Sequence, residues 1–244
     1  MDDMIHYHGT PLSGATEQQI LFYRGRHALM SWPSYSPIHI PITECCRSFC
    51  IDNGAFTFWK GNEEVDWQDF YSFVAKWVNH PRFDFYLIPD VIGGTVEQND
   101  NLLDQAIPGG VPVFHVGEPF ARIESFLGKG YKRMAIGTTK GFELKSLLFW
   151  NEMRKIFDHL CIDGVPRMKV HGLRMLDPEI VEAFPFSSGD STTATRKATF
   201  NTEWEGYPYA PVSKAARATL VADRIERGQS PSFYKSKPIQ LDLI

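Results

Sequence analysis

Long apolar runs, a dominant charge and a signal-like N-terminus are all missing from this 244-residue sequence. No stretch approaches the roughly 20 apolar residues of a membrane span. The first ten residues, MDDMIHYHGT, have neither the basic nor the apolar region of a secretory signal. We therefore expect a cytoplasmic protein with no membrane partner. The formal charge of −4 excludes global attraction to nucleic acid, so a nucleic-acid contact would need a local basic surface.

Cysteine is scarce, and its spacing excludes two further classes. The four cysteines are Cys161 and a cluster of Cys45, Cys46 and Cys50. A disulfide scaffold would spread them, and a structural zinc site would need a second spaced pair. We interpret them as reduced, partly buried thiols; a redox or metal role is the alternative.

What the sequence does contain is an alternation of short β-type apolar runs with segments of helical period. Helical spacing is clearest over 67–78, 119–128, 142–160, 177–184 and after Ser213. Eight strands alternating with helices predict a single-domain α/β protein, a (β/α)8 TIM barrel. An open doubly wound sheet is the alternative, because no convincing helix separates the first two strands. The expected strands are His6–Gly9, His27–Trp32, Arg47–Asp52, Phe85–Asp90, Pro112–Val116, Arg133–Thr138, Lys169–Leu173 and Phe186–Asp190.

Polar residues at the ends of these strands are the first candidates for function, because such barrels place their functional groups at the C-terminal strand ends. Asp52, Asp90 and Asp190 end apolar strands and precede turn-forming residues. A single aspartate there is often only a turn former. Three that converge suit glycosidic-bond chemistry, in which one attacks or stabilises the sugar and another moves the proton. The remaining strand ends present His115 with Glu118, Gly137 with Thr138, and His171.

A set of histidines supports a different hypothesis, a metal-dependent hydrolase that resembles the amidohydrolase barrels. Imidazole and carboxylate ligands on alternating strands can bind zinc. For the first two histidines we favour a hydrogen-bonding role that supports the barrel, and we expect no metal. The hypothetical ligands are His6, His8, His115, His171 and Asp190.

Aromatic and basic residues point to a nucleic-acid partner. Phe56, Phe58 and Trp59 follow Asp52 in what we expect to be an active-site loop, where a ring could stack a nucleobase; core packing is the alternative for Phe58. The segment 213–237, on and after an expected helix, contains six basic residues and only two acidic ones. A phosphate-facing edge and a solvated helix face both explain this. An inactive nucleic-acid-binding barrel is a third hypothesis. The expected phosphate contacts are Arg174, Arg196, Lys197, Lys214, Arg217 and Arg224.

Several motifs together resemble the tRNA-guanine transglycosylase superfamily. The segment Ile51-Asp52-Asn53-Gly54-Ala55-Phe56 is similar to its D-S-G-[AG]-F signature, and His8-Gly9-Thr10-Pro11 is similar to the start of short phage and bacterial members. Those members include 7-deazaguanine DNA transglycosylases and antiviral DNA glycosylases. Further matches, in the family's order, are Ile88-Pro89-Asp90, Val111-Pro112-Val113-Phe114-His115, Ala135-Ile136-Gly137, Val170-His171-Gly172-Leu173 and Phe186-Ser187-Ser188-Gly189-Asp190-Ser191-Thr192.

The resemblance implies a role for each matching residue. Asp190 would be the nucleophile that attacks C1′, and Asp52 would be the general acid and base. Asp90 and the Gly137 backbone would contact the base, and Phe56 would stack on it. Arg196 would meet a phosphate, and we group Asn53, His115 and His171 with the substrate-binding residues.

The resemblance also implies a substrate. It covers roughly 47–197, which would be the catalytic core, followed by a helical extension over about 198–244. No cysteine follows Cys161, so the C-terminal zinc module of the tRNA enzymes is missing. We therefore expect a cofactor-free DNA glycosylase that flips a modified nucleobase out of DNA and cleaves its N-glycosidic bond, with a role in antiviral defence against phage. Exchange of a DNA base for a 7-deazaguanine is the alternative.

Overall fold

The strands close into a barrel, and a proline interrupts the closing strand. The computed structural model describes residues 3–200 and 211–236. Its main sheet is parallel, in the order β5-β4-β3-β2-β1-β11-β10-β7-β6. β5 pairs with β4 and β6 pairs with β7; between them lies Pro112, which has no N–H to donate. The two segments therefore act as one strand, and the fold is a (β/α)8 TIM barrel. The bounds are β1 Ile5–Gly9, β2 His27–Ser31, β3 Ser48–Asp52, β4 Phe83–Leu87, β5 Gly110–Val111, β6 Val113–His115, β7 Arg133–Gly137, β10 Lys169–Gly172 and β11 Ser188–Ser191.

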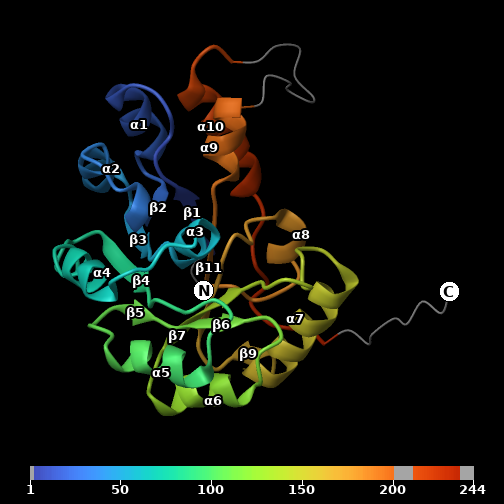
Figure 1. Ribbon diagram of the computed structural model, residues 1–244. Helices are drawn as coiled ribbons and strands as arrows, with labels where there is room; N and C mark the ends of the chain where they lie inside the picture. The colour runs from blue at the N-terminus through green and yellow to red at the C-terminus, as the bar shows by residue number, and fades with distance from the viewer. Residues whose placement is uncertain (1–2, 201–210, 237–244) are drawn as a thin grey trace.

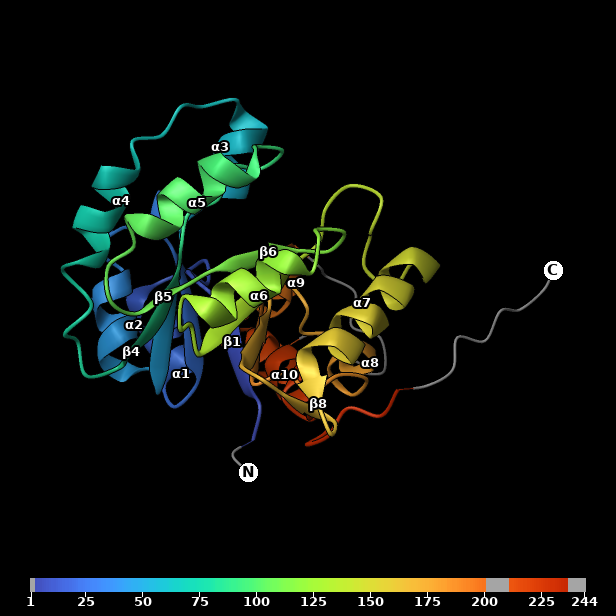
Figure 2. The same cartoon turned by 90° about the horizontal axis from the view of Figure 1, so that it is seen from below.

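Helices form a ring around the strands (Figure 1). Viewed from the side, α3 and α5 lie near the end of the barrel that is opposite the N-terminus (Figure 2). None of the helices within 3–200 and 211–236 is both long and apolar enough to cross a membrane. Their bounds are α1 Thr16–Tyr23, η1 Trp32–Ser34, α2 His39–Cys45, α3 Ala55–Gly61, α4 Trp67–Val74, α5 Val96–Asp104, α6 Ala121–Gly128, α7 Leu147–Leu160, α8 Pro178–Val181, α9 Thr193–Phe200 and α10 Lys214–Ile225, and a small hairpin is formed by β8 Cys161–Ile162 and β9 Val165–Pro166.

Two apolar clusters hold the barrel together. The larger lies between strands and helices and includes Phe70, Phe114 and Phe157, all fully buried. The smaller includes Tyr7 and Phe85 on the strands. Each fully buried aromatic contributes about 1.5–3 kcal/mol of transfer free energy, so a rigid scaffold supports the strand ends.

Several sequence-predicted boundaries are wrong for local reasons. β4 ends at Leu87, so Asp90 lies in the loop beyond it. α7 begins at Leu147 and not at 142, because Lys145 adopts a left-handed φ of 67° and Ser146 caps the helix by accepting from the N–H of Phe149. α1 lies between the first two strands, where we expected no helix. The expected extension over 198–244 falls partly outside the described residues, at 201–210 and 237–244.

The N-terminal end of the barrel is closed by polar side chains. The Tyr7 hydroxyl donates to Asp84, whose other carboxylate oxygen lies 3.1 Å from Arg133 Nη1. His27 Nδ1 lies 2.7 Å from the Ser48 hydroxyl. Burial, followed by the positive charge nearby, lowers the pKa of His27 to about 4, so the ring is neutral at pH 7. This end of the barrel therefore has a stabilising function.

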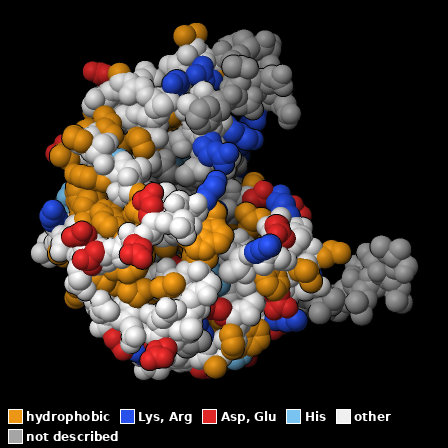
Figure 3. Space-filling view, in the orientation of Figure 1, with side chains coloured by type: hydrophobic (Ala, Val, Ile, Leu, Met, Phe, Trp, Pro, Cys, Tyr) orange, Lys and Arg blue, Asp and Glu red, His pale blue; other side chains and the backbone are white. Residues whose placement is uncertain are grey.

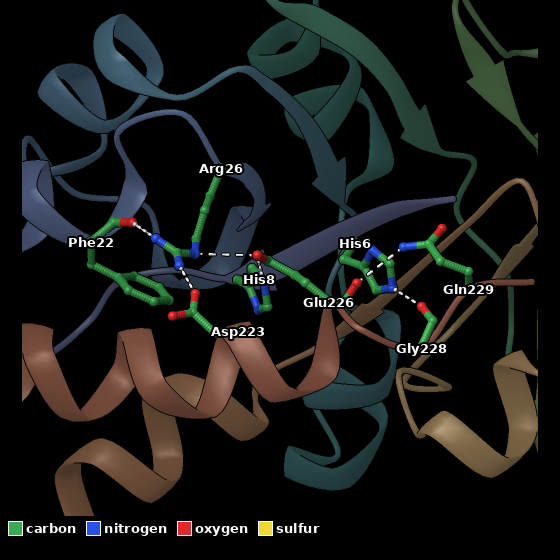
Figure 4. A network of polar contacts seen from close by, with 8 residues as sticks. All are labelled: His6, His8, Phe22, Arg26, Asp223, Glu226, Gly228 and Gln229. Carbon is green, nitrogen blue, oxygen red and sulfur yellow. Dashed lines mark hydrogen bonds and ion pairs between the residues drawn. The ribbon is translucent and has the colours of Figure 1, made fainter. Parts of the chain in front are cut away.

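α10 is docked on the outer side of β1 by a polar network (Figure 4). His8 Nε2 donates to Glu226 Oε1 at 2.8 Å, and Arg26 Nε donates to the same oxygen at 3.1 Å. His6 Nε2 donates to the carbonyl of Gly228 at 2.9 Å. These contacts confirm that the first two histidines support the barrel by hydrogen bonds.

Candidate active site

Asp190 is held by hydrogen bonds to both of its carboxylate oxygens. It lies on β11 and is 4% exposed. Oδ2 accepts from His171 Nε2 at 3.1 Å, and Oδ1 accepts from the backbone N–H of Arg174 at 3.1 Å. His171 is fully buried, and its Nδ1 accepts from the Ser188 hydroxyl at 2.8 Å. His171 therefore fixes the orientation of the Asp190 carboxylate.

The chain from Ser188 through His171 to Asp190 has the residue types of a serine hydrolase triad, but Ser188 is only 1% exposed. A nucleophile must reach a substrate. The Ser188 hydroxyl instead donates to His171 Nδ1 and orients the histidine.

Asp52 ends β3, and its surroundings change the pKa of its carboxyl group. Burial, and next the negative charge of Asp190, raise the pKa of Asp52 to about 6. The backbone N–H of Gly54, the charge of Arg174 and the hydroxyl of Ser31 act in the opposite direction and are outweighed. A carboxyl group with such a pKa can give and take a proton near neutral pH. The site therefore combines one anchored carboxylate with one proton-exchanging carboxyl group.

A second group of charges surrounds His115 at the end of β6. Its Nε2 lies 3.2 Å from Asp90 Oδ2, and its Nδ1 lies 3.9 Å from Glu118 Oε1. Burial alone would lower the pKa of His115, but the two nearby carboxylates of Asp90 and Glu118 outweigh it and raise the pKa to about 9. Gly137 lies beside this group, since a Cβ atom built on it would lie 3.4 Å from the His115 ring.

Asn53 uses its amide to position the backbone. Its Nδ2 donates to the carbonyl of Ile88 at 3.0 Å, and its Oδ1 accepts from the N–H of Ala55 at 2.7 Å. Gly54 adopts a left-handed φ of 77°, and a Cβ there would overlap Pro33 at 2.2 Å. These contacts join the ends of β3 and β4 and start α3 directly after Asp52.

The prediction that Phe56, Phe58 and Trp59 lie in an active-site loop is therefore wrong, because all three lie on α3. The Phe58 ring packs against Trp32 and Trp67 with centroid distances of 5.6 and 6.3 Å, which confirms its alternative core role. Phe56 is 43% exposed, so its ring can still meet a ligand from the helix.

A pocket of about 600 Å³ opens beside His115, lined by the loops after β4, β6 and β7 and by residues of α5 and α6. Its wall includes Glu118 and Arg122, and Arg122 Nη1 donates to Asp100 Oδ1 at 3.0 Å. Phe142 and Val116 supply apolar surface. His115 borders both this pocket and Asp90, whereas Asp52 and Asp190 do not line the pocket.

The alternative metal site is not assembled. His6 and His8 point from β1 toward α10, whereas His171 contacts Asp190 and His115 contacts Asp90. Within 3–200 and 211–236, no three His, Cys, Asp or Glu side chains are grouped to hold a metal ion. Side chains alternate along a strand, so His6 and His8 lie on the other face of β1 from the residue between them, and the ligand set of the hydrolase hypothesis does not converge.

The expected phosphate contacts have different surroundings. Arg174, Arg196 and Lys197 are exposed, the last two on α9 directly after Asp190's strand. Lys214 Nζ instead donates to the Ser13 hydroxyl at 2.8 Å, and Arg217 binds three backbone carbonyls. Arg224 is exposed on α10. In the orientation of Figure 1, basic side chains gather between the α9 and α10 region and the centre of the face, and acidic ones are more frequent below (Figure 3).

Sequence reasoning missed Ser188 as a member of the site. The signal was present, because Ser188 precedes Asp190 by two residues and side chains two apart on a strand share a face. No protein-family model and no curated protein sequence matches this chain. A functional assignment therefore depends on the residues of the site.

Proposed function

We propose that the protein cleaves the N-glycosidic bond of a modified nucleobase in DNA, with Asp190 as nucleophile. The observation that carries the proposal is the pair of unequal carboxyl groups at one end of the barrel. Asp190 is fixed by His171 and by the N–H of Arg174, and burial beside that charge raises the pKa of Asp52 to about 6. A nucleophile and a proton donor are the two groups that this reaction requires.

The proposed reaction has two steps. The Asp190 carboxylate attacks C1′ of the deoxyribose while the C1′–N bond breaks, and the leaving base takes a proton from Asp52. Water then gives a proton back to Asp52 and attacks C1′, which releases Asp190 and leaves an abasic sugar. A second base in place of water would produce base exchange, which is the alternative outcome of the same first step.

Recognition of the flipped base is assigned to the residues around His115. The carboxylate of Asp90 can accept from an N–H group on the base edge, and Phe56 is 43% exposed, so its ring can be offered for stacking. The neighbouring pocket of about 600 Å³ gives room for a substituent, which supports a modified base as the substrate. Removal of such bases from foreign DNA would serve antiviral defence.

DNA is proposed to lie across the mouth of the barrel toward α9 and α10. Arg196 and Lys197 are exposed on the helix that follows β11, and phosphate contacts position a duplex without reading its sequence. Lys214 and Arg217 already have polar partners within the protein, so we assign the main phosphate contacts to α9.

The test is mass spectrometry of free bases and nucleosides after incubation with normal and with hypermodified phage DNA. Wild-type protein should release one base and leave abasic sites, and chelators should not slow it. Asp190→Asn should lose about 10³-fold or more in rate. The matched control is Asp104→Asn, whose carboxylate is exposed and pairs with Lys129 on the surface; it should retain full activity.

Each other outcome has a clear meaning. If supplied 7-deazaguanine is incorporated into the DNA and no abasic sites form, the reaction is base exchange and not hydrolytic cleavage. Loss of activity on chelation would favour the metal-dependent hydrolase. Failure to release or exchange a base from any of these DNAs would refute the proposal.

A further inference from the structure

Arg174 contacts Asp190 and Phe56, and its charge also acts on Asp52. Its backbone N–H donates to Asp190 Oδ1 at 3.1 Å. Its guanidinium carbon lies 4.3 Å from the centre of the Phe56 ring, and its charge acts on Asp52. The residue follows β10 and adopts a left-handed φ of 58°. One exposed residue therefore joins the nucleophile, the proton donor and the stacking ring.

The guanidinium occupies the surface that a nucleobase would need. The guanidinium carbon lies over one face of the Phe56 ring, 4.3 Å from its centre, and Phe56 as a residue is 43% exposed. A base stacked on an aromatic ring gains more free energy than an exposed cation–π contact, so a base can displace the arginine. The displaced positive charge then needs a new partner, and a phosphate next to the flipped nucleotide supplies one.

We propose that Arg174 covers Phe56 in the free protein and moves to a backbone phosphate when a flipped base takes the ring. The inference rests on the proposed function and adds a basis for substrate selection. A base within a nucleic-acid chain replaces the arginine and also binds it, whereas a free base must displace it without compensation. The site thus favours a base within a polynucleotide over the same base in solution.

Arg174→Asn tests the inference without disturbing the loop. Asparagine tolerates a left-handed φ, and the backbone N–H that binds Asp190 is kept. Two probes are measured by titration calorimetry: 7-deazaguanine as a free base, and a 12-nucleotide single-stranded DNA of mixed sequence over a range of NaCl concentrations. Arg174→Lys is the matched control, because it keeps the charge and loses the planar stacking group.

The two probes should respond in opposite directions. In Arg174→Asn, 7-deazaguanine should bind about two- to fivefold more tightly, because the ring is uncovered. The DNA should bind more weakly, and the slope of log affinity against log salt should fall by about 0.7. Arg174→Lys should keep the wild-type slope while it also improves binding of the free base. A loop that only supports the fold would weaken both probes together and lower the melting temperature.

The inference is overturned if the free base binds no more tightly to Arg174→Asn than to wild type, or if the salt slope is unchanged. If wild type releases bases from DNA in that case, the proposed function stands and only the role of Arg174 is refuted. If wild type neither releases a base nor binds the DNA, the function and the inference are both refuted.

Discussion

Raising the pH should slow base release, because the proposed proton donor is Asp52. Burial, followed by the charge of Asp190, raises the pKa of Asp52 to about 6, so the carboxyl group is half protonated at that pH. Only the protonated form can give a proton to the leaving base. The rate with limiting DNA reports the free enzyme and should therefore follow the protonated fraction of Asp52.

The size of the effect follows from this pKa. About a tenth of Asp52 is protonated at pH 7 and about a hundredth at pH 8, by the ordinary titration curve. The rate at limiting DNA should thus fall about tenfold between pH 7 and pH 8. His115 titrates near 9, above this range. In Asp190→Asn the nearby negative charge is lost, so the pKa of Asp52 should fall.

The assay is the initial rate of base release from pH 5 to pH 8.5 at limiting DNA, with NMR of the carboxyl carbons to follow Asp52 directly. Asp52→Asn should be slow and should lack the decline. A rate that is independent of pH between 6.5 and 8.5, or an Asp52 carboxyl group that titrates near 4, would refute the assignment of Asp52 as acid.

Three further predictions concern stability and charge. Because the pKa of Asp52 is higher in the folded than in the unfolded protein, ionisation of this carboxyl group opposes folding at any pH above its unfolded pKa. Asp52→Asn should therefore raise the free energy of unfolding by about 1–3 kcal/mol at pH 8 and leave it unchanged at pH 3. Equal urea midpoints for the two proteins at pH 8 would contradict this. His115 should titrate near pH 9 by NMR and at a lower pH in Asp90→Asn, and its ion pairs should add stability that is complete below about 6.5 and lost as the pH rises through 9. Burial would raise the pKa of Glu226, but His8 and Arg26 outweigh it and lower that pKa. Glu226→Gln should therefore lower the free energy of unfolding by about 1 kcal/mol at pH 7, and this loss should disappear as acid protonates Glu226 in the wild type. A loss that stays constant down to pH 3 would exclude a charge effect.

The sequence predicted the barrel because each strand is a short β-type run that ends in a turn. It did not predict α1, because Gln19 occupies a buried position on that helix and interrupts its apolar pattern. The Gln19 amide accepts from the N–H of Leu12 at 2.8 Å, a contact that only the folded chain reveals. The β8–β9 hairpin was missed although Asp163-Gly164 is a typical turn pair with left-handed φ angles of 51° and 78°.

The candidate site was predictable where it depended on strand ends and not where it depended on packing. The positions of Asp52 and Asp190 follow from the rule that parallel strands end at one face. The helix that carries Phe56 begins where it does because Gly54 is left-handed and the Asn53 amide binds the N–H of Ala55. An Asn-Gly pair in the sequence fits a loop as well as the start of a helix, so the sequence alone did not predict this helix. The guanidinium over Phe56 joins residues more than a hundred positions apart, so no local pattern predicts it.

The most direct measurement is intact-protein mass spectrometry of a reaction on DNA that the protein cleaves, quenched in acid, followed by peptide mapping. A covalent sugar intermediate on Asp190 should appear as protein plus the oligonucleotide without its base. It should map to the β11 peptide and be absent from Asp190→Asn. An adduct on another residue, or base release by Asp190→Asn at the wild-type rate, would contradict the account.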